Sequence, residues 1–280
     1  MNKMNVFKGS DEYVVTNELM NAVNVSIALQ KPLLIKGEPG TGKTMLAEAI
    51  SKSLGMELII WGIKSTTKAQ EGLYVYDTVQ RLYDSQFGEG NVGDIKQYIK
   101  LGKLGEAFNS DKQVVLLIDE IDKADLEFPN DLLWELDKME FYINETKETI
   151  KTKHRPIVII TSNAEKELPD AFLRRCIFHY IEFPDQEKMA EIIKVHFGDI
   201  DRKLQEKALE AFYEIRKMDA IQKKPSTSEL LDWIQALMIS GVDIKNLSKE
   251  MPFIGVLLKK NQDIDTMEEI KTKGYSLKRW

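Results

Sequence analysis

The stretch that decides the fold is Gly37-Glu38-Pro39-Gly40-Thr41-Gly42-Lys43-Thr44, which matches the phosphate-binding pattern G-x-x-x-x-G-K-[ST] at every required position. The apolar run Leu33-Leu34-Ile35 precedes it, and apolar residues at helical spacing follow it from Met45 to Leu54. This order predicts a strand, a glycine-rich loop and the start of a helix, which is the context that makes the pattern specific. The sequence therefore predicts a site for a nucleoside triphosphate.

The residue types of this loop suit the binding of phosphates. Glycines let backbone N–H groups point at an anion, and the start of a helix favours negative charge. We expect Lys43 to reach the outer two phosphates, Thr44 to ligate Mg²⁺, and Glu38 to point to solvent. Val14 and Val15 either line an adenine pocket or simply begin the core. The residues predicted to bind the nucleotide are Gly37, Glu38, Pro39, Gly40, Thr41, Gly42, Lys43, Thr44, Met45, Val14 and Val15.

Length, composition and charge place the chain among ordinary globular proteins. Its 280 residues suffice for one large domain or two smaller ones, with 43% hydrophobic and 30% charged residues. A net charge of −6 argues against a bulk nucleic-acid binder, although it leaves room for a locally basic groove. One cysteine excludes an internal disulfide, and no signal peptide or membrane-spanning run is evident, so we expect a cytoplasmic protein. Three scattered histidines do not predict a zinc site.

Two acids follow a second apolar run. Residues 114–118 are all apolar, which predicts a strand buried on both faces, and Asp119 and Glu120 come directly after them. The first acid can hold Mg²⁺, and the second can orient and polarise an attacking water. The alternative is a solvated strand end that happens to be charged. The loop upstream favours the catalytic interpretation.

A third apolar run, residues 156–160, leads to Asn163. An amide at the end of a strand beside the two acids would lie near the γ-phosphate, although asparagine is also common in turns. A short helix over 168–176 then ends in Arg174 and Arg175, and a last strand is predicted over 177–183.

The remaining segments complete the predicted architecture. We expect a first helix over 14–29, a strand over 58–61, a helix over 128–138 and a β-hairpin over 140–153. The connection 62–112, with helical pieces near 79–86 and 101–108, is long enough to suggest contacts with a partner or substrate. Beyond Pro184, helices are predicted over 187–197, 201–218, 228–240 and 244–260. The predicted domains are an α/β core over 1–185 and a helical domain over 186–280.

The order of these motifs resembles the AAA+ ATPases. The finer wording resembles their MoxR-like branch, in the segments GEPGTGKT, KSTTKAQEGLYVYD, VVLLIDEIDKAD, TSNAEKELPDAFLRRC and PSTSELLDW. The resemblance runs from about residue 13 to residue 237. It implies a five-stranded parallel sheet flanked by helices, followed by a four-helix lid.

The same resemblance implies an assembly and roles for particular residues. It implies a homo-oligomeric ring, commonly a hexamer, with ATP between neighbours and a von Willebrand factor A-domain protein as partner. It places Arg175 as the arginine finger that reaches the next subunit's γ-phosphate, while Arg174 stays open between a similar role and a surface salt bridge. Ser228 stands where many family lids carry an arginine, which leaves the coupling of the lid to ATP open. Its alternative is an ordinary helix N-cap region with Glu229.

The leading hypothesis is Mg²⁺-dependent ATP hydrolysis by a chaperone-like remodeller or assembly factor of other proteins. The predicted catalytic residues are Lys43, Glu120, Asn163 and Arg175, and the predicted metal ligands are Thr44 and Asp119. One alternative is a nucleic-acid-directed ATPase, such as a loader or a restriction-type motor. Another is a scaffold that assembles with ATP and turns it over little.

Overall fold

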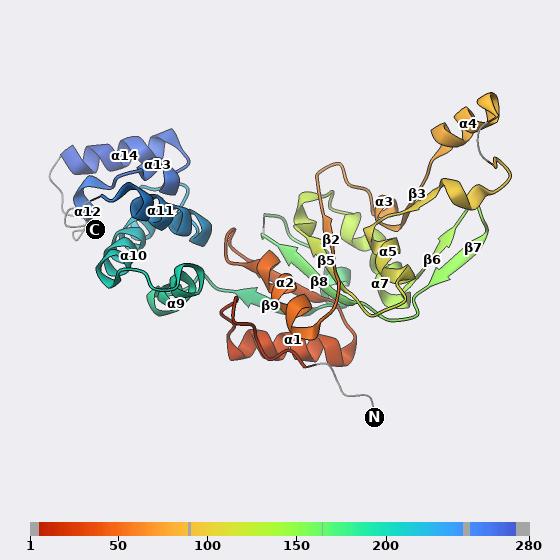
Figure 1. The fold of residues 1–280 in the computed structure, drawn as a ribbon, viewed down its shortest axis with the longest axis horizontal. Coiled ribbons are helices and arrows are strands. Elements are labelled where there is room, and N and C mark those ends of the chain that lie inside the picture. The colour runs from red at the N-terminus through yellow and green to blue at the C-terminus, as the bar shows by residue number, and fades with distance from the viewer. Residues whose placement is uncertain (1–5, 89–90, 164, 243–246, 273–280) are drawn as a thin grey trace. The chain divides into compact units, whose positions relative to one another are not determined.

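A parallel sheet forms the centre of the first part of the chain (Figure 1). The computed structural model describes residues 6–88, 91–163, 165–242 and 247–272. The sheet has five strands in the order β2-β5-β8-β1-β9, which confirms the predicted fold class. The strands are β1 (Leu33–Gly37), β2 (Leu58–Gly62), β5 (Val115–Asp119), β8 (Ile157–Ser162) and β9 (Ile177–Ile181).

The central strands are apolar along their length because helices cover the sheet. Every residue of β8 is buried, as are the first four of β5. In the strand register, Ile159 of β8 pairs with Leu117 of β5 on one side and with Leu33 of β1 on the other. Since all three strands are parallel, the residues that follow them meet at one edge of the sheet.

The helices of this part begin and end close to their predicted bounds, with three differences. The first helix starts at residue 17 rather than 14 because Thr16 caps it, accepting from the Leu19 N–H. The predicted helix 128–138 is divided at Leu132, and the helix predicted over 168–176 covers only four residues. The helices are α1 (Asn17–Leu29), α2 (Lys43–Leu54), α5 (Lys103–Asn109), α6 (Phe128–Asp131), α7 (Leu133–Lys138) and α8 (Asp170–Leu173).

The long connection between β2 and β5 folds as an insertion with its own small sheet. It contains α3 (Ala69–Leu73), β3 (Tyr74–Tyr76), α4 (Thr78–Phe87), the 3₁₀ turn η1 (Ile95–Tyr98) and β4 (Ile99–Leu101), with β3 and β4 antiparallel. The small sheet was not predicted, because three-residue strands carry too little pattern. The predicted hairpin is confirmed as β6 (Glu140–Ile143) and β7 (Glu148–Lys151).

The insertion and the β6–β7 hairpin lie side by side (Figure 1). The Asn144 N–H donates to the Tyr74 hydroxyl at 3.1 Å, and Lys96 pairs with Glu148 at 2.6 Å. Positions 89 and 90 of the insertion lie outside the described residues.

The C-terminal part is helical and has its own core, which includes Phe212, Leu230 and Trp233. Its first three helices were predicted within a few residues. The single helix predicted over 244–260 is wrong where the chain is described, because Pro252 and the left-handed Met251 and Phe253 separate two short helices. A final helix was missed, and the tail 273–280 lies outside the described residues. The helices are α9 (Gln186–Phe197), α10 (Arg202–Lys217), α11 (Thr227–Ser240), α12 (Leu247–Glu250), α13 (Ile254–Leu257) and α14 (Asn261–Thr272).

Contacts along the chain divide it into two compact units. One contains the chain up to residue 10 together with 15–37 and 42–181, and the other contains 11–14, 38–41 and the chain from 182 onward. The predicted domain boundary at residue 185 falls close to the start of the second unit's main segment.

No helix in the described ranges is both long and apolar enough to cross a membrane.

Candidate active site

The glycine-rich loop is held in shape by its own residues. Gly40 and Gly42 have φ angles of +75° and +81°, which a residue with a Cβ adopts only with strain. The Thr41 hydroxyl donates to the Glu38 carbonyl at 2.9 Å, and Lys43 Nζ donates to the Gly37 carbonyl at 3.0 Å. Lys43 is only 6% exposed, so its ammonium group lies inside the loop rather than in solvent.

Thr44 and Asp119, the two predicted metal ligands, lie together at the carboxyl edge of the sheet. The Thr44 hydroxyl lies 3.1 and 3.2 Å from the two carboxylate oxygens of Asp119. A hydroxyl and a carboxylate are hard oxygen donors of the kind Mg²⁺ takes, so this pair fits the ion. Within the described ranges, no three His, Cys, Asp or Glu side chains form a metal cluster, so Mg²⁺ here would depend on substrate phosphates as well.

Thr161 joins the two acids and was missed as a functional residue. Its buried hydroxyl donates to Asp119 Oδ1 at 2.6 Å and accepts from the Glu120 N–H at 2.8 Å. It therefore fixes the Asp119 carboxylate and the backbone of Glu120 at once. The signal was present in the sequence, since a hydroxyl at the end of an otherwise apolar buried strand needs a polar partner.

Glu120 and Asn163 also lie together, as their positions after neighbouring strands predicted. Asn163 Nδ2 donates to Glu120 Oε1 at 2.9 Å, and Lys123 Nζ donates to Glu120 Oε2. Glu120 adopts a left-handed backbone, with φ +59°, and the hydrogen bond to Glu120 raises the pKa of Lys123. Each carboxylate oxygen thus has one partner and keeps a second acceptor site, so Glu120 is held in place and can still accept from a water.

Asp122 is the second residue that sequence reasoning missed. It is 2% exposed and accepts from two backbone groups, the N–H of Asn163 at 3.3 Å and that of Glu165 at 3.0 Å. These bonds fasten the segment after β8 to the 3₁₀ turn η2 (Ile121–Lys123). Asp122 therefore sets where Asn163 stands relative to Glu120.

Arg174 and Arg175 are not part of this group. They precede β9, at the amino edge of the sheet, and the chain's own acids lie at the carboxyl edge. Arg175 Nε donates to Asp137 at 2.7 Å, and its Nη1 donates to the Ala171 carbonyl at 2.8 Å. Arg174 is exposed, and its side chain makes no hydrogen bond or ion pair with any residue that the structure describes.

Glu38 does not simply point to solvent, as was predicted, because its carboxylate accepts from Arg216 Nη2 at 2.8 Å. Pro39 is exposed, Met45 is partly exposed, and Val14 and Val15 are half-buried, so their contacts with a nucleotide stay predictions. For Ser228 the N-cap interpretation is confirmed. It lies in the first turn of α11, where Ser226 and Glu229 form a capping box with a 2.6 Å bond from the Ser226 N–H to the glutamate.

Relatives of the chain are found among curated proteins. It is 28% identical over 204 residues to the Pachytene checkpoint protein 2 homolog of Canis lupus familiaris, across 68% of this chain and 43% of that protein. It is 26% identical over 197 residues to Pachytene checkpoint protein 2 of Saccharomyces cerevisiae, across 62% of this chain and 32% of that protein. The chain thus spans less than half the length of these relatives.

A family model supplies the assignment. The model described as ATPase family associated with various cellular activities (AAA) matches residues 33–185, which is more than half of the chain. The matched range contains the glycine-rich loop, both acids, Asn163 and Arg175. The match confirms the predicted enzyme class, an ATPase. This chain therefore belongs to the AAA family of ATPases.

Proposed function

We propose that this chain hydrolyses ATP with Mg²⁺ in a homo-oligomer and uses the reaction to remodel a partner protein. The observation that carries the proposal is the hydrogen bond of 2.9 Å between Asn163 and Glu120, beside the Thr44–Asp119 pair. In the proposed reaction, this amide and this carboxylate together hold the attacking water.

Each residue of the site has a distinct part in this reaction. Lys43 and the loop N–H groups bind the outer phosphates, and Thr44 and Asp119 hold Mg²⁺, which neutralises phosphate charge when it is bound. Asn163 positions the water, and Glu120 orients it and accepts its proton. Lys123 and Asn163 hold the Glu120 carboxylate in place while it accepts from the water.

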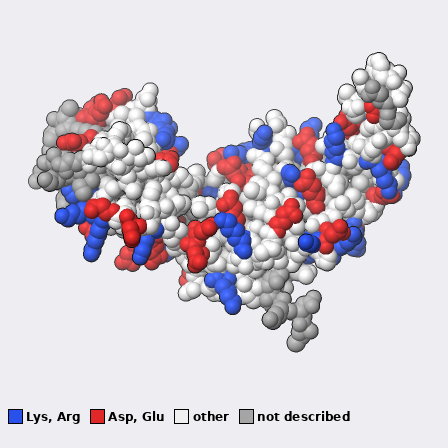
Figure 2. Space-filling model, viewed as in Figure 1, with Lys and Arg blue, Asp and Glu red and all other residues white. Residues whose placement is uncertain are grey.

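A protein partner is supported by the surface of α4. Val79, Tyr83 and Phe87 are 80%, 48% and 64% exposed, and they recur four residues apart, which places them on one face of the helix. Grouped exposed apolar side chains are typical of protein-binding surfaces. Figure 2 shows basic and acidic residues interspersed over the visible face, rather than the single-sign basic stripe of a nucleic-acid binder.

Three more specific predictions rest only on the amino-acid sequence of the motifs. They are the MoxR-like branch, a hexameric ring and a von Willebrand factor A-domain partner. The curated relatives carry another name, Pachytene checkpoint protein 2, and do not support that branch. We therefore propose the partner only as a protein, and the assembly only as a ring of copies in which ATP lies between neighbours.

The test of hydrolysis is Glu120→Gln, which keeps the shape of the side chain and removes its charge. We expect kcat to fall by roughly 10²-fold or more while ATP binding, measured by calorimetry, is retained. The control is Glu127→Gln, an exposed acid on the same segment, which should keep the wild-type rate. Normal turnover by Glu120→Gln would refute the assignment.

A mixing experiment tests the shared site. Arg175→Ala alone should lose activity, because each site lacks the arginine of its neighbour, yet it should still bind ATP. Adding Glu120→Gln subunits supplies intact arginines to sites that still have Glu120, so some activity should return. Absence of rescue at every ratio would argue that Arg175 does not act across subunits.

A further inference from the structure

Asp137, an acid on α7 outside the site described above, contacts the proposed arginine finger. Its carboxylate accepts from Arg175 Nε at 2.7 Å. The two side chains come from segments 38 residues apart, and each is nearly half exposed, at 46% for Asp137 and 43% for Arg175. The contact therefore joins α7 to the chain just before β9, at the amino edge of the sheet.

The position of Asp137 is electrostatically unfavourable within its own helix. It stands in the last turn of α7, where the helix carbonyls disfavour negative charge. Arg155 offsets this locally, since its Nη2 donates to the Leu136 carbonyl at 3.2 Å. The helix itself therefore does not favour an acid at position 137, and the hydrogen bond to Arg175 gives a reason for one.

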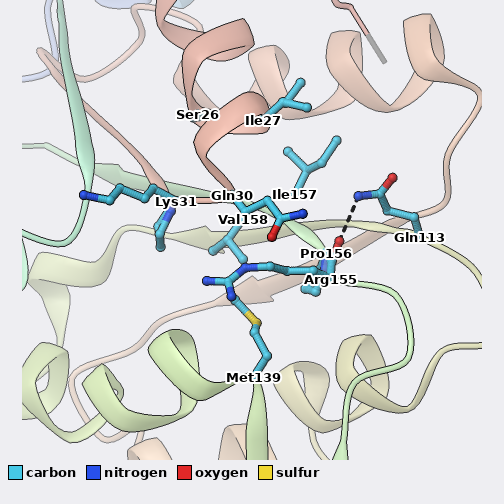
Figure 3. Close-up of a pocket in the computed structure, with 11 residues that line it drawn as sticks. Ser26, Ile27, Gln30, Lys31, Gln113, Met139, Arg155, Pro156, Ile157 and Val158 are labelled. Carbon is cyan, nitrogen blue, oxygen red and sulfur yellow. Dashed lines mark hydrogen bonds between the residues drawn. The ribbon is translucent and has the colours of Figure 1, made fainter. Parts of the chain in front are cut away.

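Arg155, which lies near Asp137, is held in place by its own contacts. Figure 3 shows its side chain along a small hollow that Met139 and Val158 also line, and its backbone carbonyl accepts from Gln113 Nε2 at 2.8 Å. Its Nε is buried without a hydrogen-bond partner among the described residues. Burial lowers the pKa of Arg155, and the negative charge of Asp137 opposes that shift, so the two side chains interact electrostatically.

The contacts of Arg175 leave one side of its guanidinium open. Nε is bound to Asp137 and Nη1 to the Ala171 carbonyl, while Nη2 has no partner in the described part of the chain. A free arginine samples many rotamers, and two hydrogen bonds to different elements restrict it to few. Arg174, next in sequence, has no such contacts and is the contrasting case.

We propose that Asp137 is a positioning residue that holds Arg175 with its Nη2 edge facing the nucleotide of a neighbouring subunit. This rests on the proposed function, in which Arg175 acts across subunits. In this role Asp137 acts through Arg175 and not on the nucleotide itself. It raises the fraction of time that the arginine spends in the orientation that stabilises the transition state.

The test compares the ATPase kinetics of the full chain in five variants. We expect Asp137→Ala to lower kcat about five- to tenfold, the modest effect that an exposed ion pair allows, with KM for ATP and the size of the assembly unchanged. Asp137→Glu, which keeps the carboxylate, should recover most of the rate. Glu206→Ala removes another exposed ion pair to an arginine Nε, in α10, and should keep the wild-type kcat.

The double variant Asp137→Ala/Arg175→Ala decides whether Asp137 acts through the arginine. If it does, the double variant is no slower than Arg175→Ala. An additional loss in the double variant, or a wild-type kcat for Asp137→Ala beside an inactive Arg175→Ala, would overturn this inference and leave the proposed function standing. A wild-type kcat for Arg175→Ala would overturn the finger assignment and this inference together.

Discussion

The two edges of the central sheet are built differently. At the carboxyl edge, the Asp119 and Glu120 side chains each have hydrogen-bond partners from the same chain, and Thr161 and Asp122, which support them, are buried. At the amino edge, Arg175 and Asp137 form one half-exposed pair, and Arg174 has no partner among the described residues. The residues that would hold water and metal are thus already in contact within a single chain. The residues that would act on a neighbouring subunit stay exposed.

This difference predicts how substitutions divide between folding and catalysis. Thr161 and Asp122 at the carboxyl edge are buried, so removing the polar group of either leaves another group without a partner and costs stability as well as rate. The amino edge is exposed, so changes there should affect rate or reactivity and leave the free energy of unfolding nearly unchanged.

The largest expected effect at the carboxyl edge, apart from that of Glu120 itself, comes from Thr161→Val. Valine keeps the shape and removes the hydroxyl, so Asp119 loses a donor and the Glu120 N–H is left buried without an acceptor. We expect the free energy of unfolding to fall by about 1–3 kcal/mol, measured by chemical denaturation. We expect kcat to fall roughly tenfold to a hundredfold.

Thr161→Ser is the matched control, because it restores the hydroxyl and removes only a methyl group. It should recover most of the rate and of the stability. Equal losses in both variants would mean that the methyl group matters and the hydroxyl bridge does not. Wild-type behaviour of Thr161→Val would show that the two acids are held without it.

A smaller effect is expected from Asp122→Asn. The amide keeps one acceptor oxygen but turns an NH₂ group toward an N–H of Asn163 or Glu165, so one buried hydrogen bond is lost. We expect a loss of about 1–2 kcal/mol in the free energy of unfolding and a kcat a few-fold lower, because Asn163 shifts relative to Glu120. The control is Asp125→Asn, an exposed acid three residues on. Rates and stabilities equal to the wild type would contradict a clamping role for Asp122.

The sequence was sufficient for the parts of the fold and site that short, contiguous patterns specify. The loop at Gly37–Thr44 and the acids after the run 114–118 carry their chemistry in adjacent residues, and strand order placed Asn163 beside Glu120. The hairpin at 140–153 was predictable because its apolar residues alternate about a polar turn.

The parts that were missed depend on contacts between distant segments. Thr161 and Asp122 are ordinary residues until β8 lies beside β5 and brings the hydroxyl to Asp119. Asp137 lies in α7 and Arg175 lies just after α8, and periodicity alone does not bring these two segments together. The helix predicted over 244–260 failed for a local reason, since its apolar spacing was followed through Pro252, which a helix interior does not tolerate.

The smallest predicted effect is a change in the alkylation rate of Cys176, which lies at the amino edge of the sheet. Cys176 is the chain's single cysteine, it directly follows Arg175, and it is half-buried. The pKa of its thiol is raised to about 12, mainly by burial and also by the charge of Asp137, while the charge of Lys31 acts in the opposite direction. Because only the thiolate reacts with iodoacetamide, alkylation of the wild type should be slow at pH 9 and should accelerate as the pH rises.

Asp137→Asn removes one of the causes that raise the pKa, so more thiolate is present at a given pH. Since Asp137 is exposed and screened by solvent, we expect only about a twofold faster alkylation at pH 9, measured by mass spectrometry of the intact chain. Glu206→Ala, distant in sequence and in the other unit, should leave the rate unchanged. A rate that is unchanged or lower in Asp137→Asn would place the carboxylate away from Cys176, and therefore away from the orientation in which it can hold Arg175.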